Sequence, residues 1–116
     1  MAFFSASAVG YYGFHGDEQL TEESPPGEDF LARLAYAWEQ EAFRAADRGA
    51  RVVIARIGVV LAAQSGALNQ MSPLFKRYVG GPVGDGNQWC SWIHIDDLAE
   101  AFIFLIRNEA IKGAFN

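Results

Sequence analysis

Hydroxyl side chains near the start of the chain are the first candidates for chemistry. Ser5 and Ser7 alternate with alanines in a run of small residues, and Tyr11 and Tyr12 follow shortly after. A serine hydroxyl can donate a hydrogen bond to an oxygen that gains negative charge during a reaction. A tyrosine can act as an acid when burial or a nearby charge changes its pKa. Alternatively, the two serines satisfy backbone groups at the end of a strand.

A second group of polar residues lies near residue 94. His94 is followed by Asp96 and Asp97, a pattern that suits either a metal ion or a base with orienting carboxylates. The group also stands between an expected short strand and an expected helix. The sequence therefore favours a structural role, in which Asp97 caps the helix and His94 makes a buried hydrogen bond. We predict no metal site.

Three other residues were weighed for chemistry. Cys90 is the single cysteine, which excludes an internal disulfide, and we expect a packed or half-exposed thiol rather than a nucleophile. Arg56 stands inside an apolar run and needs a buried partner, with a ligand contact as the alternative. Tyr36 is followed four positions later by Gln40. Without a nearby cation, a phenol keeps a pKa near ~10 and is a poor base at neutral pH.

The elements that position these residues alternate along the chain. We expect strands over residues 3–9, 51–61, 92–95 and 114–116, and helices over residues 28–48, 68–79 and after Asp97. Residues 10–13, 15–27 and 80–86 read as turns and loops. The first strand is expected to be buried, and Val and Ile without alternation over residues 51–61 are typical of a parallel strand covered on both faces. The order predicts an α/β layer with a parallel sheet.

The helical periodicity predicts which side chains enter the core. One face of the helix over residues 28–48 is expected to be buried, and Gly49 stands where a C′ glycine belongs. The members of this face are Phe30, Leu34, Trp38, Ala42 and Ala45. In the last helix, Asp97 and Glu100 form a capping box. The apolar face of that helix comprises Leu98, Ala101, Phe102, Leu105 and Ile106.

Composition limits the classes of function. A chain of 116 residues is at most one domain, and a net charge of −5 argues against nucleic acid or an anionic membrane as a partner. No apolar run is long enough for a bilayer span, and residues 1–4 do not begin a signal peptide. Together with the single cysteine, these features favour a cytoplasmic location.

Several short motifs together carry a family resemblance. They are SAVGYYG at residues 7–13, DFL at 29–31, WE at 38–39, RIGVVL at 56–61, GGP at 80–82, QW at 88–89 and WIH at 92–94. The set resembles an atypical extended short-chain dehydrogenase/reductase, namely the epimerase-like family of the NAD-dependent epimerase/dehydratase superfamily that is sometimes labelled cell-division-inhibitor-like. One departure is residues 62–66, where the family tends to have a glycine-rich turn.

The resemblance implies the fold and the cofactor. The fold would be α/β, part of a Rossmann-like doubly wound parallel sheet, with residues 1–116 as the second half of an epimerase/dehydratase domain. The front half of that fold binds the dinucleotide through a strand, a G-x-x-G-x-x-G turn and a helix, and we expect no such unit here. The full-length protein would use NAD or NADP, and this chain alone would bind neither.

The resemblance also assigns site residues. The catalytic candidates are Ser7, Tyr11 and Tyr12; the cofactor-binding candidates are Ser5, Ala6 and Ser7; the substrate-pocket candidates are Gln88, Trp89 and Trp92. The family's usual catalytic pair is a tyrosine with a lysine four positions later. Alignment on Glu39 places Leu31 and Ala35 at those two positions, and neither side chain can titrate.

Three interpretations of function remain open. The first is an NAD(P)-dependent epimerase or oxidoreductase that acts on a nucleotide-sugar-like or other small substrate. The second is a catalytically silent dinucleotide-binding or regulatory protein on the same fold. The third is a small domain that associates with itself through an exposed sheet edge.

Overall fold

The chain forms two structural units. The computed structural model describes residues 1–63 and 65–116. One unit comprises Met1–Ile57 and Ile103–Asn116, and the other comprises Gly58–Phe102. The strands and helices expected from the sequence are present within these units. Gln64, in the segment that departs from the family's glycine-rich turn, lies outside the described residues.

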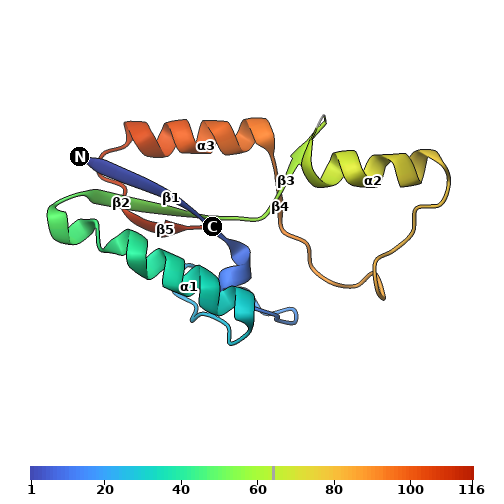
Figure 1. Cartoon of the computed structure of the whole chain (residues 1–116), viewed down its shortest axis with the longest axis horizontal. Helices are drawn as coiled ribbons and strands as arrows, with labels where there is room; N and C mark the ends of the chain where they lie inside the picture. The colour runs from blue at the N-terminus through green and yellow to red at the C-terminus, as the bar shows by residue number, and fades with distance from the viewer. Residues whose placement is uncertain (64) are drawn as a thin grey trace. The chain divides into compact units, whose positions relative to one another are not determined.

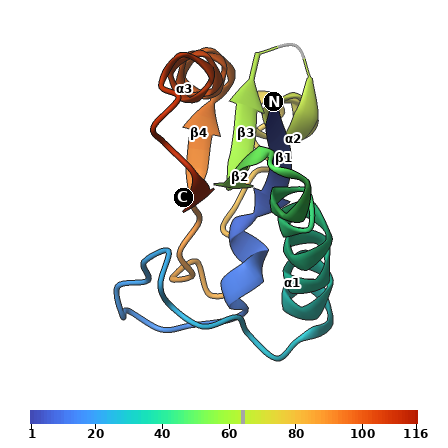
Figure 2. The same cartoon turned by 90° about the vertical axis from the view of Figure 1, so that its left-hand side faces the viewer.

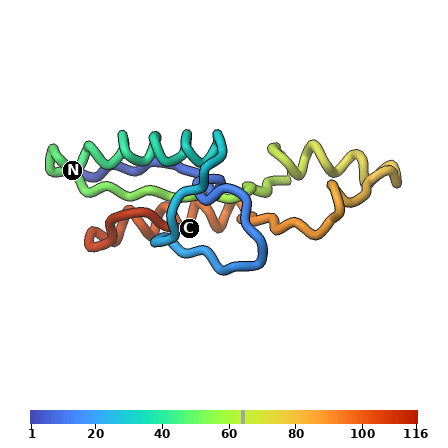
Figure 3. Tube along the Cα trace, turned by 90° about the horizontal axis from the view of Figure 1, so that it is seen from below, coloured from blue at the N-terminus to red at the C-terminus, as the bar shows by residue number. Residues whose placement is uncertain are grey.

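The first unit is built on a parallel sheet. Its strands are β1 (Ala2–Ala8), β2 (Arg51–Ile57) and β5 (Gly113–Phe115), in the order β1-β2-β5. Helix α1 (Phe30–Phe43) lies on one face of the sheet, and the end of helix α3 (Ile95–Arg107) lies on the other (Figures 1 and 3). The predicted α/β architecture with a parallel sheet is therefore confirmed.

A short helical turn connects β1 to the loop that precedes α1. This 3-10 helix, η1 (Val9–Tyr12), lies alongside α1 (Figure 2). Helix α1 begins after Asp29, whose carboxylate accepts hydrogen bonds from the backbone N–H groups of Leu31 and Ala32 at 2.9 and 3.1 Å. A second 3-10 helix, η2 (Ala46–Arg48), ends at Gly49 with φ of 78°. Gly49 is therefore a left-handed glycine at a helix end, but it ends η2 and not the predicted long helix, because α1 already ends at Phe43.

The buried face of α1 differs from the predicted one. Phe30, Leu34 and Trp38 are 70%, 51% and 60% exposed, whereas Ala32, Glu39 and Ala42 are buried. Small side chains allow the helix to approach the strands closely, and Glu39 is drawn inward by a charged partner on β2. Of the predicted face, Ala42 is buried and Ala45 packs against the core as expected, but the expected burial of the large residues Phe30, Leu34 and Trp38 was wrong.

Strand β1 is less buried than expected. Within the described residues it lies at the edge of its sheet, Phe3 is 43% exposed, and Ser5 is its one buried residue. The buried apolar cluster instead comprises Ala42, Val52 and Ile54, with Phe43, Ala45 and Ala114 packed against it. The core therefore centres on β2, which has a neighbouring strand on both sides.

Arg51 at the start of β2 caps the carboxyl end of α3. Its guanidinium donates hydrogen bonds to the backbone carbonyls of Leu105, Ile106, Asn108 and Ile111, at 2.8 to 3.3 Å. The carbonyls at a helix end lack intrahelical partners and carry partial negative charge, so a cation there is favourable. This role of Arg51 was not expected from the sequence.

The second unit has its own pair of parallel strands. They are β3 (Val59–Ala62) and β4 (Trp92–His94), with helix α2 (Gly66–Lys76) between them in the chain. The single strand expected over residues 51–61 is divided at Gly58, where an added Cβ would stand 2.5 Å from the carbonyl oxygen of Ser91. Gly58 thus permits a close approach of two backbone segments.

Helix α3 begins earlier than predicted. It starts at Ile95, directly after β4, so Asp97 lies in its first turn and the expected cap at Asp97 was wrong. The expected burial was also too deep: Leu98, Phe102 and Leu105 are half-buried, while Ala101 and Ile106 are exposed. Among the described helices, none is long and apolar enough to cross a membrane.

Candidate functional site

Four segments of the first unit converge near the carboxyl ends of β1 and β2. Ser7 on β1 and Arg56 on β2 are register partners, and Tyr11 and Tyr12 lie in η1, immediately after β1. Glu39 reaches this point from α1. Ligand sites of open parallel sheets lie at the carboxyl ends of the strands, so this is the position at which a site is expected.

A buried ion pair joins α1 to β2. The Arg56 Nε and Nη2 atoms donate to Glu39 Oε1 and Oε2 at 2.9 and 2.8 Å, and the two side chains are 4% and 2% exposed. The predicted need of Arg56 for a buried partner is confirmed. Sequence reasoning used Glu39 only as an alignment landmark. An arginine inside an apolar strand was the signal that a buried carboxylate had to exist.

Ser7 is hydrogen-bonded to this ion pair. Its Oγ donates to Glu39 Oε1 at 2.7 Å, and its side chain remains half-buried. Ser5, two residues earlier, faces α1 as well, and its Oγ accepts from Trp38 Nε1 at 3.1 Å. Side chains alternate between the faces of a strand, so Ala6 lies on the opposite, exposed side. The three cofactor-binding candidates therefore do not share one face.

Both tyrosines contact the Arg56 guanidinium. Tyr12 Oη accepts from Arg56 Nη1 at 2.8 Å and donates to Asn116 Oδ1 at 2.7 Å. The Arg56 guanidinium lies 3.5 Å from the ring centroid of Tyr11, a close cation–π contact. Glu22 completes the cluster, because its carbonyl accepts from Arg56 Nη1 at 3.1 Å and its carboxylate accepts from the Asn116 N–H at 3.0 Å.

The electrostatics of the cluster follow from this geometry. Burial raises the pKa of Tyr11, and this effect outweighs the opposing charge of Arg56. Burial alone would lower the pKa of Arg56, but hydrogen bonds to Glu39 and Tyr12 outweigh it and raise that pKa. The hydrogen bond from the Asn116 N–H lowers the pKa of the Glu22 carboxyl. Tyr11 is therefore a protonated phenol at neutral pH, suited to donate a hydrogen bond rather than to act as a base.

The substrate-pocket candidates belong to the second unit. Gln88 is exposed, and Trp89 and Trp92 are 78% and 63% exposed. The Gln88 side-chain amide donates to the carbonyl of Val83 at 2.7 Å, which orders the loop ahead of β4. Both indole rings present large apolar surfaces.

Two other groups from the sequence analysis are also in the second unit. Cys90 is exposed. His94 is exposed and accepts a hydrogen bond from the Asp96 N–H at 3.3 Å, so the expected buried hydrogen bond was wrong. Within the described residues, no three His, Cys, Asp or Glu side chains gather into a group that could hold a metal ion.

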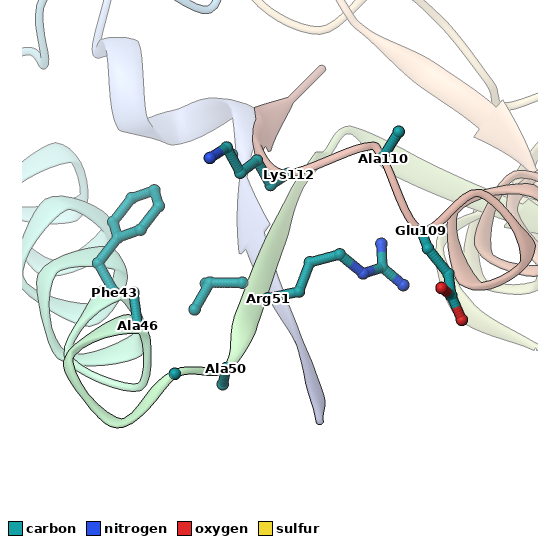
Figure 4. A pocket seen from close by; sticks show the side chains of 10 residues that line it. Phe43, Ala46, Ala50, Arg51, Glu109, Ala110 and Lys112 are labelled. Atoms are coloured by element: carbon teal, nitrogen blue, oxygen red, sulfur yellow. The ribbon is translucent and has the colours of Figure 1, made fainter.

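Two hollows lie on the first unit. A cavity of about 410 Å³ adjoins the site and is lined by residues on both sides of the connecting loop, among them Tyr12, His15, Pro26 and Asp29. A larger hollow of about 810 Å³ is lined by Phe43, Arg51 and Lys112, among others (Figure 4). It lies at the amino end of β2, roughly 16 Å along the strand from Arg56 at the usual rise per residue. Its volume therefore does not make it the functional site.

The end of β1 has open space of the kind that the nicotinamide ring of a dinucleotide cofactor needs. The exposed face of β1 carries the small side chains of Ala6 and Ala8, and a Cβ added at Gly10 would meet nothing within 4 Å. This strand end therefore leaves room for a flat ring. The same residues offer nothing that would hold a pyrophosphate, so the fit is to the nicotinamide end of the cofactor alone.

The spacing G-x-x-G-x-x-G does occur after β1, at Gly10, Gly13 and Gly16, and the sequence analysis overlooked it. Its first glycine lies within η1, the motif is followed by a loop, and the next helix, α1, does not begin until Phe30. A Cβ at Gly13 would lie 2.7 Å from Asp29 Oδ2, and one at Gly27 would lie 2.5 Å from the carbonyl oxygen of Tyr12. These glycines allow two loop segments to pack together, and they do not form a phosphate-binding turn.

The match to a protein-family model shows which family the chain belongs to. The model of the NAD dependent epimerase/dehydratase family matches residues 1–116. The chain belongs to this family. The predicted membership in the NAD-dependent epimerase/dehydratase superfamily is therefore confirmed, and so is the Rossmann-like fold class.

Relatives and solved structures agree with this family. The epimerase family protein SDR39U1 homolog of Arabidopsis thaliana chloroplasts is 46% identical over 97% of this chain. An epimerase family protein of Staphylococcus aureus is 44% identical over 99% of the chain. The chain spans 32% and 39% of these two proteins, so it corresponds to about a third of their length.

Two crystal structures match the fold. A nucleoside-diphosphate sugar epimerase from Corynebacterium glutamicum superposes with a TM-score of 0.90 at 46% identity, over 97% of this chain and 24% of that protein. Human epimerase family protein SDR39U1, crystallised with NADPH, superposes with a TM-score of 0.85 at 34% identity, over 97% of this chain and 38% of that one.

Proposed function

We propose that residues 1–116 are the second half of an epimerase/dehydratase domain in a longer NAD(P)-dependent protein of the cytoplasm. In this proposal, the protein acts as an epimerase or oxidoreductase on a nucleotide-sugar-like or other small substrate. The observation that carries the proposal is the cluster of Ser7, Tyr11 and Tyr12 around the Glu39–Arg56 pair. The NAD dependence of the matched family and the NADPH in the human structure support the cofactor class.

The roles of the residues follow from their contacts. The bound nicotinamide would accept or return a hydride. Tyr11 would donate a hydrogen bond to a substrate oxygen, since burial raises its pKa and the phenol keeps its proton at neutral pH. Arg56 and Glu39 would hold Tyr12 and Ser7 in place. In the second unit, the indole rings of Trp89 and Trp92 would provide apolar walls for the substrate, with Gln88 as a polar contact.

The proton chemistry would differ from that of the usual family members. If Glu39 aligns with the family's glutamate, Leu31 and Ala35 stand at the positions of the tyrosine–lysine pair. We therefore expect the protein to work without that pair, through hydroxyl groups near the end of β1. Tyr36 lies outside the hydrogen-bonded cluster of Ser7, Tyr12, Glu39 and Arg56, and would be dispensable.

The test of this proposal is turnover by the full-length protein. Nucleotide sugars would be screened with NADP⁺ and NAD⁺, with product formation followed by chromatography. We expect Ser7→Ala to lower turnover more than Tyr36→Phe does, with circular dichroism unchanged in both. Equal, negligible effects of changes at Ser7, Tyr11 and Tyr12 on a confirmed activity would place the site elsewhere.

One observation favours the second candidate, a silent dinucleotide-binding or regulatory protein. The hydroxyl hydrogens of Ser7 and Tyr12 are both directed at protein acceptors, Glu39 and Asn116. A site whose hydroxyl donors are already engaged suits binding better than proton transfer. Tight binding of NADP⁺ without turnover of any nucleotide sugar would support this candidate over the enzyme.

A further inference from the structure

The buried ion pair fixes the direction of the hydrogen bond between Ser7 and Glu39. The Arg56 guanidinium is positively charged at any accessible pH, and an unneutralised cation in the interior is costly. Within the described residues, Glu39 is the carboxylate that forms a buried ion pair with Arg56, so Glu39 is its anion. An ionised carboxylate accepts hydrogen bonds and cannot donate them. At 2.7 Å, the hydrogen between Ser7 Oγ and Glu39 Oε1 therefore belongs to Ser7.

A serine hydroxyl has one hydrogen and two acceptor lone pairs. With its hydrogen directed at Glu39, Ser7 can offer only lone pairs to anything that approaches its open side, and that side exists because the residue is half-buried. The usual electrostatic role of such a serine, donation to a developing oxyanion, needs the opposite orientation.

We infer that Ser7 is a hydrogen-bond acceptor for the bound ligand, and that Glu39 and Arg56 are positioning residues that impose this polarity. The ligand group that meets Ser7 must then carry an N–H or O–H. This inference rests on the proposed function, which supplies two sources of that chemistry: the carboxamide N–H of a nicotinamide, or a hydroxyl of a nucleotide sugar. A carbonyl oxygen is disfavoured at this point.

The surrounding contacts keep Glu39 from turning. Arg56 holds both carboxylate oxygens, and its remaining Nη1 is held by Tyr12 Oη and the Glu22 carbonyl. The Tyr11 ring packs against the guanidinium at 3.5 Å. A carboxylate held by these contacts keeps Oε1 facing Ser7. The direction of the Ser7 hydroxyl hydrogen is therefore fixed in the folded protein before any ligand binds.

Neutron crystallography of the full-length protein after deuterium exchange tests the polarity without a ligand. We expect deuterium on Ser7 Oγ, directed at Glu39 Oε1. Deuterium on Glu39, or a Ser7 deuterium directed away from it, would overturn the inference. This result does not depend on any activity, so it is separate from the fate of the proposed function.

Binding measurements on the full-length protein identify the ligand group. One pair of probes is NADP⁺ and its acetylpyridine analogue, in which a methyl group replaces the carboxamide nitrogen. The other pair is UDP-glucose and a deoxyfluoro analogue, in which fluorine replaces the reacting hydroxyl. We expect the analogue of one pair to bind about 3- to 10-fold more weakly than its parent, the usual effect of one lost neutral hydrogen bond.

Variants test whether the difference in affinity between a parent probe and its analogue depends on Ser7. Ser7→Ala should bind both members of the affected pair equally well. Glu41→Gln, a control change at an exposed position of α1, should keep the wild-type ratio between the dissociation constants of the two probes. Equal binding within both pairs in the wild type, or a ratio that survives Ser7→Ala, would overturn the inference. Absence of binding by both parent probes would contradict the proposed function, and the neutron result would still decide the polarity of Ser7.

Discussion

At the residue scale, the Glu39–Arg56 pair is the most consequential contact in the described chain. Both side chains are almost fully buried, and removal of one partner leaves the other charge uncompensated. We expect Glu39→Ala and Arg56→Ala each to lower the free energy of unfolding by about 3–5 kcal/mol. Urea denaturation followed by circular dichroism would measure this.

The exposed pair Glu41–Arg44 provides the control. Its side chains are 71% and 72% exposed at an N···O distance of 2.9 Å, and Glu41→Ala should cost at most about 1 kcal/mol. The double variant Glu39→Leu with Arg56→Met should be more stable than either single alanine variant, because no charge is left unpaired. A double variant less stable than both would contradict this account.

His15 gives a prediction about pH. Hydrogen bonds to Glu18 and to the Tyr12 carbonyl raise the pKa of His15, and the same contact with His15 lowers the pKa of Glu18. A raised histidine pKa in the folded state means that the contact stabilises the protein fully below the unfolded value of about 6.5. This contribution is lost as pH rises through the folded pKa, and the contribution of Glu18 is lost as pH falls through its own.

NMR titration of the His15 ring protons would measure this shift. We expect a midpoint above that of an unstructured histidine peptide, and a lower midpoint in Glu18→Gln. Glu23→Gln, a change on the same exposed loop, should leave the midpoint in place. An unchanged midpoint in Glu18→Gln would show that the ring is not held by that carboxylate.

At the scale of the element, α1 presents its large side chains outward. Trp38→Ala should therefore cost about 1 kcal/mol, mainly the hydrogen bond to Ser5, and not the larger amount that a core tryptophan would cost. Ala32 is fully buried, and Ala32→Leu should cost about 1–3 kcal/mol through overpacking. If Trp38→Ala proves the more damaging of the two in chemical denaturation, the facing of α1 in this structure is wrong.

The order of the strands and helices was easier to predict from the sequence than which face of each helix is buried. Hydrophobic runs and caps gave the strands and helices in the right order, because those signals are local. The facing of α1 was missed because periodicity identifies an apolar stripe but not the surface that it packs on. The buried stripe is instead made of small residues and Glu39, which only a contact with Arg56 on another element explains.

The grouping of the candidate residues could be predicted from the sequence, but the hydrogen bonds between them could not. Ser7, Tyr11 and Tyr12 were expected at the end of the first strand, and the structure gathers them around Arg56. Their hydrogen-bond partners come from residues far along the chain, such as Asn116 and Glu22. No spacing rule connects such positions, so the polarity of each hydroxyl could be read only from the fold.

At the scale of the whole molecule, the chain covers about a third of its relatives' length. We expect residues 1–116 to have little or no affinity for NAD(H) or NADP(H), because the glycines after β1 form a loop rather than a helix opening. Isothermal titration calorimetry measures this, with the full-length protein as the positive control. Low-micromolar binding that a bulky residue at Ser7 abolishes would contradict the prediction.

The edge of the sheet leads to a second prediction at this scale. Strand β1 has β2 on one side only among the described residues, and Phe3 on it is 43% exposed. We expect residues 1–116 to self-associate as concentration rises, since an unprotected edge pairs readily with another strand. Light scattering over a concentration series measures this, and Phe3→Lys should reduce it. A monomer at every concentration would argue against pairing through β1.

The residues of the Arg56 cluster are far apart in the sequence, and this separation affects the folding kinetics. Its hydrogen bonds join Arg56 to residues 17, 34 and 44 positions away, and Tyr12 to a residue 104 positions away. Such distant contacts form only after much chain entropy has been lost, so they belong late on the folding route. Interactions absent from the transition state act mainly on the unfolding rate. The cluster that shapes the site should therefore also set the lifetime of the native state, and Arg56→Ala should accelerate unfolding far more than it slows refolding in stopped-flow measurements.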